Sequence, residues 1–222
     1  MIEFFLDNLN YWTVFLGMMI ESSFIPFPSE VIVPPAAWLA LGPDSEMNIV
    51  LVVLVATLGA DAGALINYYL AKWLGRPIVY KFANSRVGHL CLLNGEKVAH
   101  AEEYFRKHGV VSTFFGRLVP AVRQLISIPA GLAEMKLHTF LLFTTLGAGL
   151  WNIVLAVLGY VVRVSFPNVE TTEDVSNLAS TYSHEIGYGI LAIVVVVLGY
   201  FIVKRVVKKR KAAQAGQQGP KA

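Results

Sequence analysis

The sequence predicts an all-α polytopic membrane protein with about four spanning helices and two oppositely oriented re-entrant hairpins. Hydrophobic residues make up 55% of the 222 residues and charged residues only 15%, and the mean hydropathy is +0.58. A soluble domain normally carries about 25% charged residues. The excess of apolar residues therefore requires lipid as part of the protein's surroundings.

Four apolar segments are expected to span the membrane, because a helix of about 20 residues crosses the hydrocarbon core. In order they are 10–24, 48–72, 137–162 and 186–203. The first is the shortest and ends on Glu21.

Two further segments are apolar but interrupted by prolines: 24–42 contains four and 110–131 contains two. A proline inside a helix removes a backbone donor and clashes with the preceding turn. Non-helical backbone at membrane depth survives only when it is buried in protein or lines a wet cavity. We therefore interpret both segments as re-entrant hairpins, with a kinked spanning helix as the alternative for each.

The distribution of Lys and Arg predicts the topology. Segment 72–107 carries seven of them and the C-terminal segment from 204 onward another seven, whereas 164–185 carries none. Because positively charged loops stay in the cytoplasm, we expect 72–107 and both termini inside and 164–185 outside. The two hairpins then enter from opposite faces and meet near the midplane, as in transporters with inverted repeats. Residues 1–207 are expected to form one transmembrane domain, and 208–222 a basic, disordered cytoplasmic tail.

Few charged residues lie deep in the apolar segments, and each costs roughly 2.5–3.5 kcal/mol at the centre of a spanning helix. They are Glu21, Glu30, Asp61, Arg117 and Arg123. Arginine grips phosphate through two hydrogen bonds, so Arg117 and Arg123 are candidates for binding a phosphate-bearing ligand. Glu21 and Glu30 are expected beside them. A buried carboxylic acid can carry a proton, which makes Glu21, Glu30 and Asp61 candidates for proton coupling. An ion pair that only stabilises the fold is the alternative.

The sequence shows no H-E-x-x-H or G-x-S-x-G motif and no cluster with metal-ligand spacing. We therefore expect no catalytic residue, no metal and no cofactor. The expected partners are a lipid phosphate and membrane lipids, with no nucleic acid, and a homo-oligomer is left open. A membrane-embedded lipid phosphatase or other lipid-phosphate enzyme is the main alternative, and a non-transporting scaffold is a third.

The arginine segment resembles the signature of the DedA family. It reads Phe115-Gly116-Arg117-Leu118-Val119-Pro120-Ala121-Val122-Arg123 and is followed by Pro129-Ala130-Gly131. Further similar stretches are Tyr104-Phe105-Arg106-Lys107-His108-Gly109, Glu21 with Phe27-Pro28-Ser29-Glu30, Leu58-Gly59-Ala60-Asp61, and Leu74-Gly75-Arg76. One departure is Ser29-Glu30, where many members have Gly-Asp, so the acidic arm is longer here.

This resemblance implies a lipid transporter or flippase in a bacterial inner membrane. DedA proteins are regarded as transporters, some recycling undecaprenyl phosphate and others moving phospholipids, and eukaryotic relatives are lipid scramblases. By motif position, four residues match the family's functional acids and arginines: Glu21, Glu30, Arg117 and Arg123.

Overall fold

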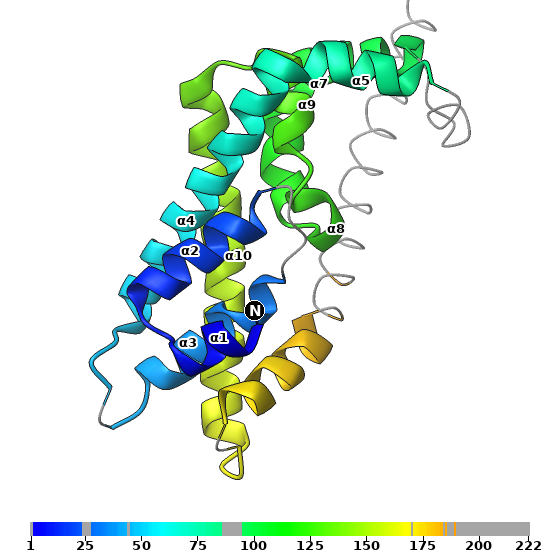
Figure 1. Cartoon of the computed structure of the whole chain (residues 1–222). Helices are drawn as coiled ribbons and strands as arrows, with labels where there is room; N and C mark the ends of the chain where they lie inside the picture. The colour runs from blue at the N-terminus through cyan, green and yellow to red at the C-terminus, as the bar shows by residue number, and fades with distance from the viewer. Residues whose placement is uncertain are drawn as a thin grey trace, which may run out of the picture.

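The computed structural model describes residues 2–23, 28–43, 45–85, 95–169, 171–183, 185 and 189. Every regular element within these residues is a helix (Figure 1). The elements are α1 (Ile2–Asp7), α2 (Tyr11–Glu21), η1 (Ser29–Val31), α3 (Val33–Ala40), α4 (Ile49–Leu70), η2 (Ala71–Gly75), α5 (Arg76–Ala83), α7 (Gly95–Arg117), α8 (Pro120–Arg123), α9 (Ser127–Leu132) and α10 (Leu137–Ser165), and a further helix covers 172–183. The expected span at 186–203 (residue 189 apart), the tail at 208–222 and residues 24–27 of the first hairpin lie outside the described residues.

Two long helices coincide with the spans expected at 48–72 and 137–162. The stretch from α4 to α5 reaches a mean hydropathy of 2.4 and α10 one of 2.0, and both are long enough to cross a membrane. Many of their large apolar side chains, such as Leu58 and Ile153, are exposed, as expected of a surface that faces lipid. The π-helical turn η2 extends α4 and leads into α5, which crosses the end of the bundle (Figure 1).

Side-chain contacts give the relative direction of α4 and α10. The Thr145 hydroxyl donates to Asp61 over 2.7 Å, and Asn152 donates to Thr57 over 3.1 Å. Since the later residue of α10 contacts the earlier residue of α4, the two helices run antiparallel.

The segment expected to span at 10–24 is a shorter helix, α2. It begins at Asn10, whose side chain caps the first turn and forms a capping box with Thr13. Its 11 residues rise only about 16 Å at 1.5 Å each, about half of the hydrocarbon thickness. The expectation of a spanning helix here is therefore wrong, because an apolar run of this length reaches only the middle of a bilayer.

α2 runs beside α4 in the same direction. At its start, the Tyr11 hydroxyl accepts a hydrogen bond from the backbone of Asn48 over 2.7 Å, just before α4 begins. Further along, the backbone of Met19 packs so closely on Gly63 that a methyl group there would overlap it. α2 thus starts at the level of the first residues of α4 and ends beside its middle.

α3 returns to the end where α2 began. Pro34 and Pro35 occupy its first turn, where the missing N–H groups leave no hydrogen bond unmade, so these prolines start a helix within the expected hairpin. The carbonyl of Pro34 packs against Gly159 of α10, and the Trp38 ring lies 4.6 Å from the guanidinium of Arg163 near the end of α10. The reversal therefore includes α2 and is longer than the 24–42 expected.

The N-terminal helix α1 lies at this same end. The Leu6 carbonyl accepts a hydrogen bond from the hydroxyl of Thr172 over 3.4 Å. The sequence predicts a cytoplasmic N terminus and an external segment 164–185. Because Leu6 and Thr172 are in contact, both segments lie on the same side, and the two expectations cannot both hold.

The second reversal comes from α7, α8 and α9. Val119 is extended, with φ −102° and ψ 115°, and Pro120 then starts α8. Gly116 packs against Ile126, and Gly109 lies beside Met135, so the chain runs back along α7. This reversal begins and ends beside the junction of α4 and α5, opposite the first one (Figure 1).

The two halves pack in equivalent ways with opposite direction. α2 lies against Gly59 of α4, as α7 lies against Gly147 of α10. α3 lies against Gly159 of α10, as Gly131 of α9 lies against the backbone of α4. The two chain reversals thus approach each other from opposite ends of α4 and α10.

Candidate functional site

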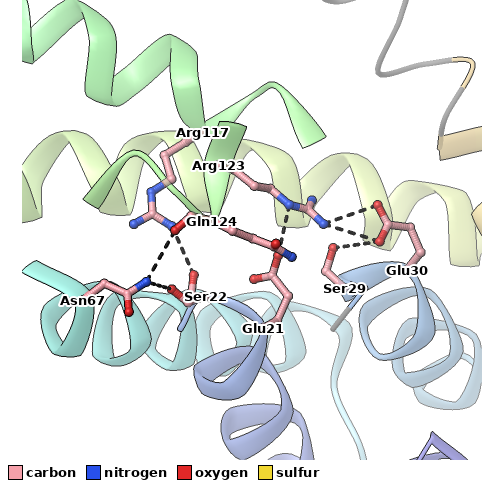
Figure 2. Close-up of polar contacts among 8 residues, drawn as sticks. All are labelled: Glu21, Ser22, Ser29, Glu30, Asn67, Arg117, Arg123 and Gln124. Carbon is pink, nitrogen blue, oxygen red and sulfur yellow. Dashed lines mark hydrogen bonds and ion pairs between the residues drawn. The ribbon is translucent and has the colours of Figure 1, made fainter. Parts of the chain in front are cut away.

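The tips of the two hairpins meet, and their charged side chains are in contact (Figure 2). Arg123, the last residue of α8, lies between Glu21 at the end of α2 and Glu30 in η1. Its Nε is 3.0 Å from Oε1 of Glu21, and its Nη2 is 3.4 Å from each carboxylate oxygen of Glu30. All three residues are buried. One guanidinium of the second hairpin therefore bridges two carboxylates of the first.

A tryptophan from α10 forms one wall around this ion-pair cluster. The guanidinium carbon of Arg123 lies 5.1 Å from the centre of the Trp151 ring, within the range of a cation–π contact. Nη1 of Arg123 has no hydrogen-bond partner among the described residues. The cluster thus retains an unused donor at its centre.

Arg117, the last residue of α7, is in a different environment. It is only 2% exposed, and its guanidinium donates to two hydroxyls, Ser22 at 3.1 Å and Ser127 at 2.9 Å. No carboxylate lies within ion-pair distance of it among the described residues, and its Nε has no hydrogen-bond partner. Arg117 is thus a buried cation held by neutral groups from both hairpins.

The backbone of both tips is tied to α4. The Asn67 side chain donates to the carbonyl of Ser22 over 3.2 Å and to that of Gln124 over 3.4 Å (Figure 2). Because Asn67 is itself buried, it fixes both tips against the same point of α4.

Asp61 lies apart from the arginine–glutamate cluster. Its Oδ2 accepts a hydrogen bond from Thr145 on α10, and its buried Oδ1 has no partner among the described residues. It is in none of the ion pairs of the described residues. Of the residues expected in the site, the structure thus joins Glu21, Glu30 and Arg123 in ion pairs and places Arg117 beside them. Asp61 forms its hydrogen bond with Thr145 instead.

The space between these groups is small. A cavity lined by both arginines, Glu21 and Trp151 has a volume of about 10 Å³, which is about enough for one water molecule. The tips are therefore closed on each other, and a lipid headgroup would need them to separate.

Sequence reasoning missed the partners of Arg117. Ser22 directly follows Glu21, and Ser127 comes two residues before Pro129, so polar residues at both tips were the available signal. The contact of Trp151 with Arg123 depends on the antiparallel placement of α10, which no local pattern gives. Asn67 was not singled out.

The described part of the chain contains no group of three or more His, Cys, Asp or Glu side chains close enough to hold a metal ion. His100, His108 and His138 are all exposed. The charged groups at the hairpin tips therefore form the candidate site.

Comparison with known proteins matches the family model of the VTT domain to residues 25–161. The chain is 36% identical over 208 residues to an alkaline phosphatase-like protein of Lactococcus lactis subsp. lactis (strain IL1403), covering 92% of this chain and 90% of that protein. No solved structure matches the chain.

Two similar proteins are named undecaprenyl phosphate transporter A. The one from Staphylococcus aureus (strain NCTC 8325 / PS 47) is 29% identical over 207 residues, covering 93% of this chain and 96% of that protein. The one from Bacillus subtilis (strain 168) is 29% identical over 200 residues, covering 90% and 91% respectively.

Proposed function

The chain belongs to the VTT-domain family, also called the DedA family, and on that premise we propose that it moves a phosphate-bearing lipid across a bacterial inner membrane without cleaving it. The substrate class is undecaprenyl phosphate or a phospholipid. Two relatives named undecaprenyl phosphate transporter A support this class.

The observation that carries the proposal is the state of Arg117. A buried cation without a carboxylate in direct contact is costly, because the two hydroxyls that it contacts offset only part of its lost hydration. An anionic ligand would supply the missing charge, and a phosphate would accept from the guanidinium Nε, which now has no partner. Arg117 is thus prepared for an anion in a way that Arg123, with two carboxylates, is not.

The two arginines therefore have different roles in the proposed cycle. Arg123 holds the hairpin tips together through Glu21 and Glu30 while the site is empty. When a phosphate reaches Arg117, the tips separate and the Arg123 ion pairs loosen. The hydrocarbon chain of the lipid stays in the bilayer beside the opening, so that only the headgroup has to pass through protein.

Proton coupling is assigned to the carboxyl groups. Glu21 and Glu30 each lose a cationic partner when Arg123 moves, and Asp61 has an unpartnered oxygen. Protonation of these carboxyl groups would remove the negative charge that the open state leaves unpaired. This would link the return of the tips to the proton gradient.

The transport proposal is tested in liposomes with a labelled isoprenyl phosphate in one leaflet, following both its sidedness and the release of inorganic phosphate. Loss of one charge-assisted hydrogen-bonding group should slow transport about 10- to 100-fold in Arg117→Gln. The matched control is Arg163→Gln. Arg163 is a partly buried arginine near the end of α10, and it contacts Trp38 and lies outside the site. Equal transport by both variants would contradict the proposal.

The second candidate function is a lipid phosphatase, favoured by one observation: two relatives from Lactococcus lactis are named alkaline phosphatase-like protein. The hydroxyls of Ser22 and Ser127 lie on Arg117, where a phosphate would bind. Release of inorganic phosphate in the liposome assay, lost in Ser127→Ala, would establish the enzyme instead of the transporter.

For the membrane orientation, we propose that the N terminus is external, together with segment 164–185, and that 72–107 is cytoplasmic. The contact between Leu6 and Thr172 supports a common side. In a Cys91→Ala background, an impermeant thiol reagent added outside should label cysteines at the exposed positions Asp7 and Glu173 alike and spare Lys81. If the cysteine at position 7 is left unlabelled from outside, as the cysteine at position 81 should be, this orientation is wrong.

A further inference from the structure

A second cavity lies at the open end of the second hairpin, away from the arginine–glutamate cluster. It has a volume of about 350 Å³ and lies between α7, the turn after α9 and the first turn of α10. We call it the mouth cavity, and its polar lining consists of Arg106, Lys107, Glu134, Lys136 and Thr139. Its size is within the range of small-ligand pockets.

The charges of the mouth cavity are unevenly paired. Lys107 is bound to Glu103 over 2.7 Å, and Glu134 is bound to Arg76 over 3.3 Å. Arg106 and Lys136 take part in no ion pair of the described residues. The cavity therefore presents two cations that belong to no ion pair among the described residues, and its one carboxylate is already engaged.

The first turn of α10 adds backbone donors to the same cavity. The helix is 29 residues long and begins at Leu137, and no side chain among the described residues caps it. Its first N–H groups have no partner within the helix, and its dipole favours an anion at this end. Thr139 and Lys136 line the cavity at this helix start. Uncapped donors, an arginine and a lysine are thus gathered around one space of suitable size.

The cavity lies where α7 passes from polar to apolar surroundings. Arg106 and Lys107 are followed by Val110 and Val111, which are exposed apolar side chains. Such a change marks the boundary between headgroups and hydrocarbon. Arg117 is ten residues beyond Lys107 on the same helix, about 15 Å away at 1.5 Å per residue.

We infer that the mouth cavity is a second phosphate-binding site, which takes a phosphate monoester at the cytoplasmic boundary of the membrane. The inference rests on the proposed function for its substrate class and for its side of the membrane. Arg106, Lys136 and the N–H groups of α10 bind the phosphate there. The site holds the headgroup in the cytoplasmic leaflet before it enters, or after it leaves, the space between the hairpin tips.

The test measures binding of a labelled isoprenyl monophosphate to the protein in phosphatidylcholine nanodiscs. An Arg117→Gln background disables the site at the hairpin tips, so the remaining binding reports the mouth cavity. Adding Arg106→Gln and Lys136→Gln should raise the Kd of that binding about 10- to 30-fold. The matched control, Lys81→Gln on exposed α5 at the same end, should leave it unchanged. Unchanged binding in the Arg106/Lys136 variant would overturn the inference.

Competitors identify the chemistry and its source. The corresponding isoprenyl alcohol should not displace the label, and equal displacement by the alcohol would also overturn the inference. Displacement by inorganic phosphate alone assigns the site to free phosphate, whereas displacement only by the isoprenyl phosphate assigns it to the lipid headgroup.

Two further readouts keep the result interpretable. Should Arg117→Gln fail to fold, the same substitutions in the wild-type background should reduce the bound lipids from two to one, counted by native mass spectrometry. If the proposed function is wrong, the Arg117→Gln protein will still transport the lipid. That outcome would not change the binding measured with the Arg106/Lys136 variant, so the two proposals can fail separately.

Discussion

The strongest stability prediction concerns Arg123, which bridges two buried carboxylates. Its distances of 3.0 Å to Glu21 and 3.4 Å to Glu30 correspond to about 5 kcal/mol of attraction for each pair at an effective dielectric constant of about 20. Most of this attraction offsets lost hydration, so the measured cost of removing one partner is smaller. Arg123→Gln should lower the free energy of unfolding by about 3–5 kcal/mol, because it leaves two uncompensated carboxylates.

The single carboxylate changes should cost less. Glu21→Gln and Glu30→Gln each leave Arg123 with one remaining partner. In the double variant Glu21→Gln/Arg123→Gln the losses should not add, with a coupling energy of about 1–3 kcal/mol. The measurement is reversible unfolding by SDS in mixed micelles at neutral pH, followed by tryptophan fluorescence.

An exposed ion pair provides the control. Lys107 and Glu103 are closer, at 2.7 Å, but both are largely exposed, so solvent screens their attraction. Lys107→Gln should leave the unfolding curve essentially unchanged. If Arg123→Gln lowers the free energy of unfolding no more than Lys107→Gln does, burial does not strengthen the Arg123 ion pairs. The conclusion that Arg123 holds the two hairpin tips together would then be wrong.

Two other predictions follow from the packing and the charges. Gly159→Ala places a methyl group on the carbonyl of Pro34 and should destabilise the protein by about 1–3 kcal/mol in the same unfolding assay. Gly149→Ala, whose methyl group would meet its nearest neighbour at 3.7 Å, should not. The hydrogen bond from Lys107 lowers the pKa of the Glu103 carboxyl below its ordinary 4.5, so the pair's contribution is present above that pH and is lost as the pH falls through the lowered pKa. NMR titration of Glu103 should show the lowered pKa in the wild type and an ordinary one in Lys107→Gln.

The long helices could be predicted almost to the residue. The stretch 48–72 is predominantly apolar and starts with Asn48, a good helix cap, and α4 begins directly after this residue. The stretch 137–162 became α10, which continues three residues further, to Ser165. In both cases composition and length decide the outcome, and tertiary contacts only adjust it.

The short elements were harder to predict from the sequence, because their roles depend on the helices that they pack against. The apolar run at 10–24 resembles a spanning helix until the length of α2 and its pairing with α4 are known. Pro34 and Pro35 predicted a break, yet proline in a first turn equally starts a helix. At the site, the charged residues could be chosen from their depth alone, but the unequal pairing of Arg117 and Arg123 depends on where serines and glutamates arrive in space.

The small volume between the hairpin tips also bears on the ion tightness of the membrane. A chain of water molecules conducts protons. If such a chain crossed a protein with several ionisable groups at its centre, protons would leak across the membrane. The cavity at the tips has room for about one water molecule and is lined by Met18, Ala60 and Ala148 besides its charged residues. Among the described residues, this close packing leaves no room for a chain of water molecules at the level of the arginines. A transporter that is packed in this way between transport events would not dissipate the proton-motive force while it is idle.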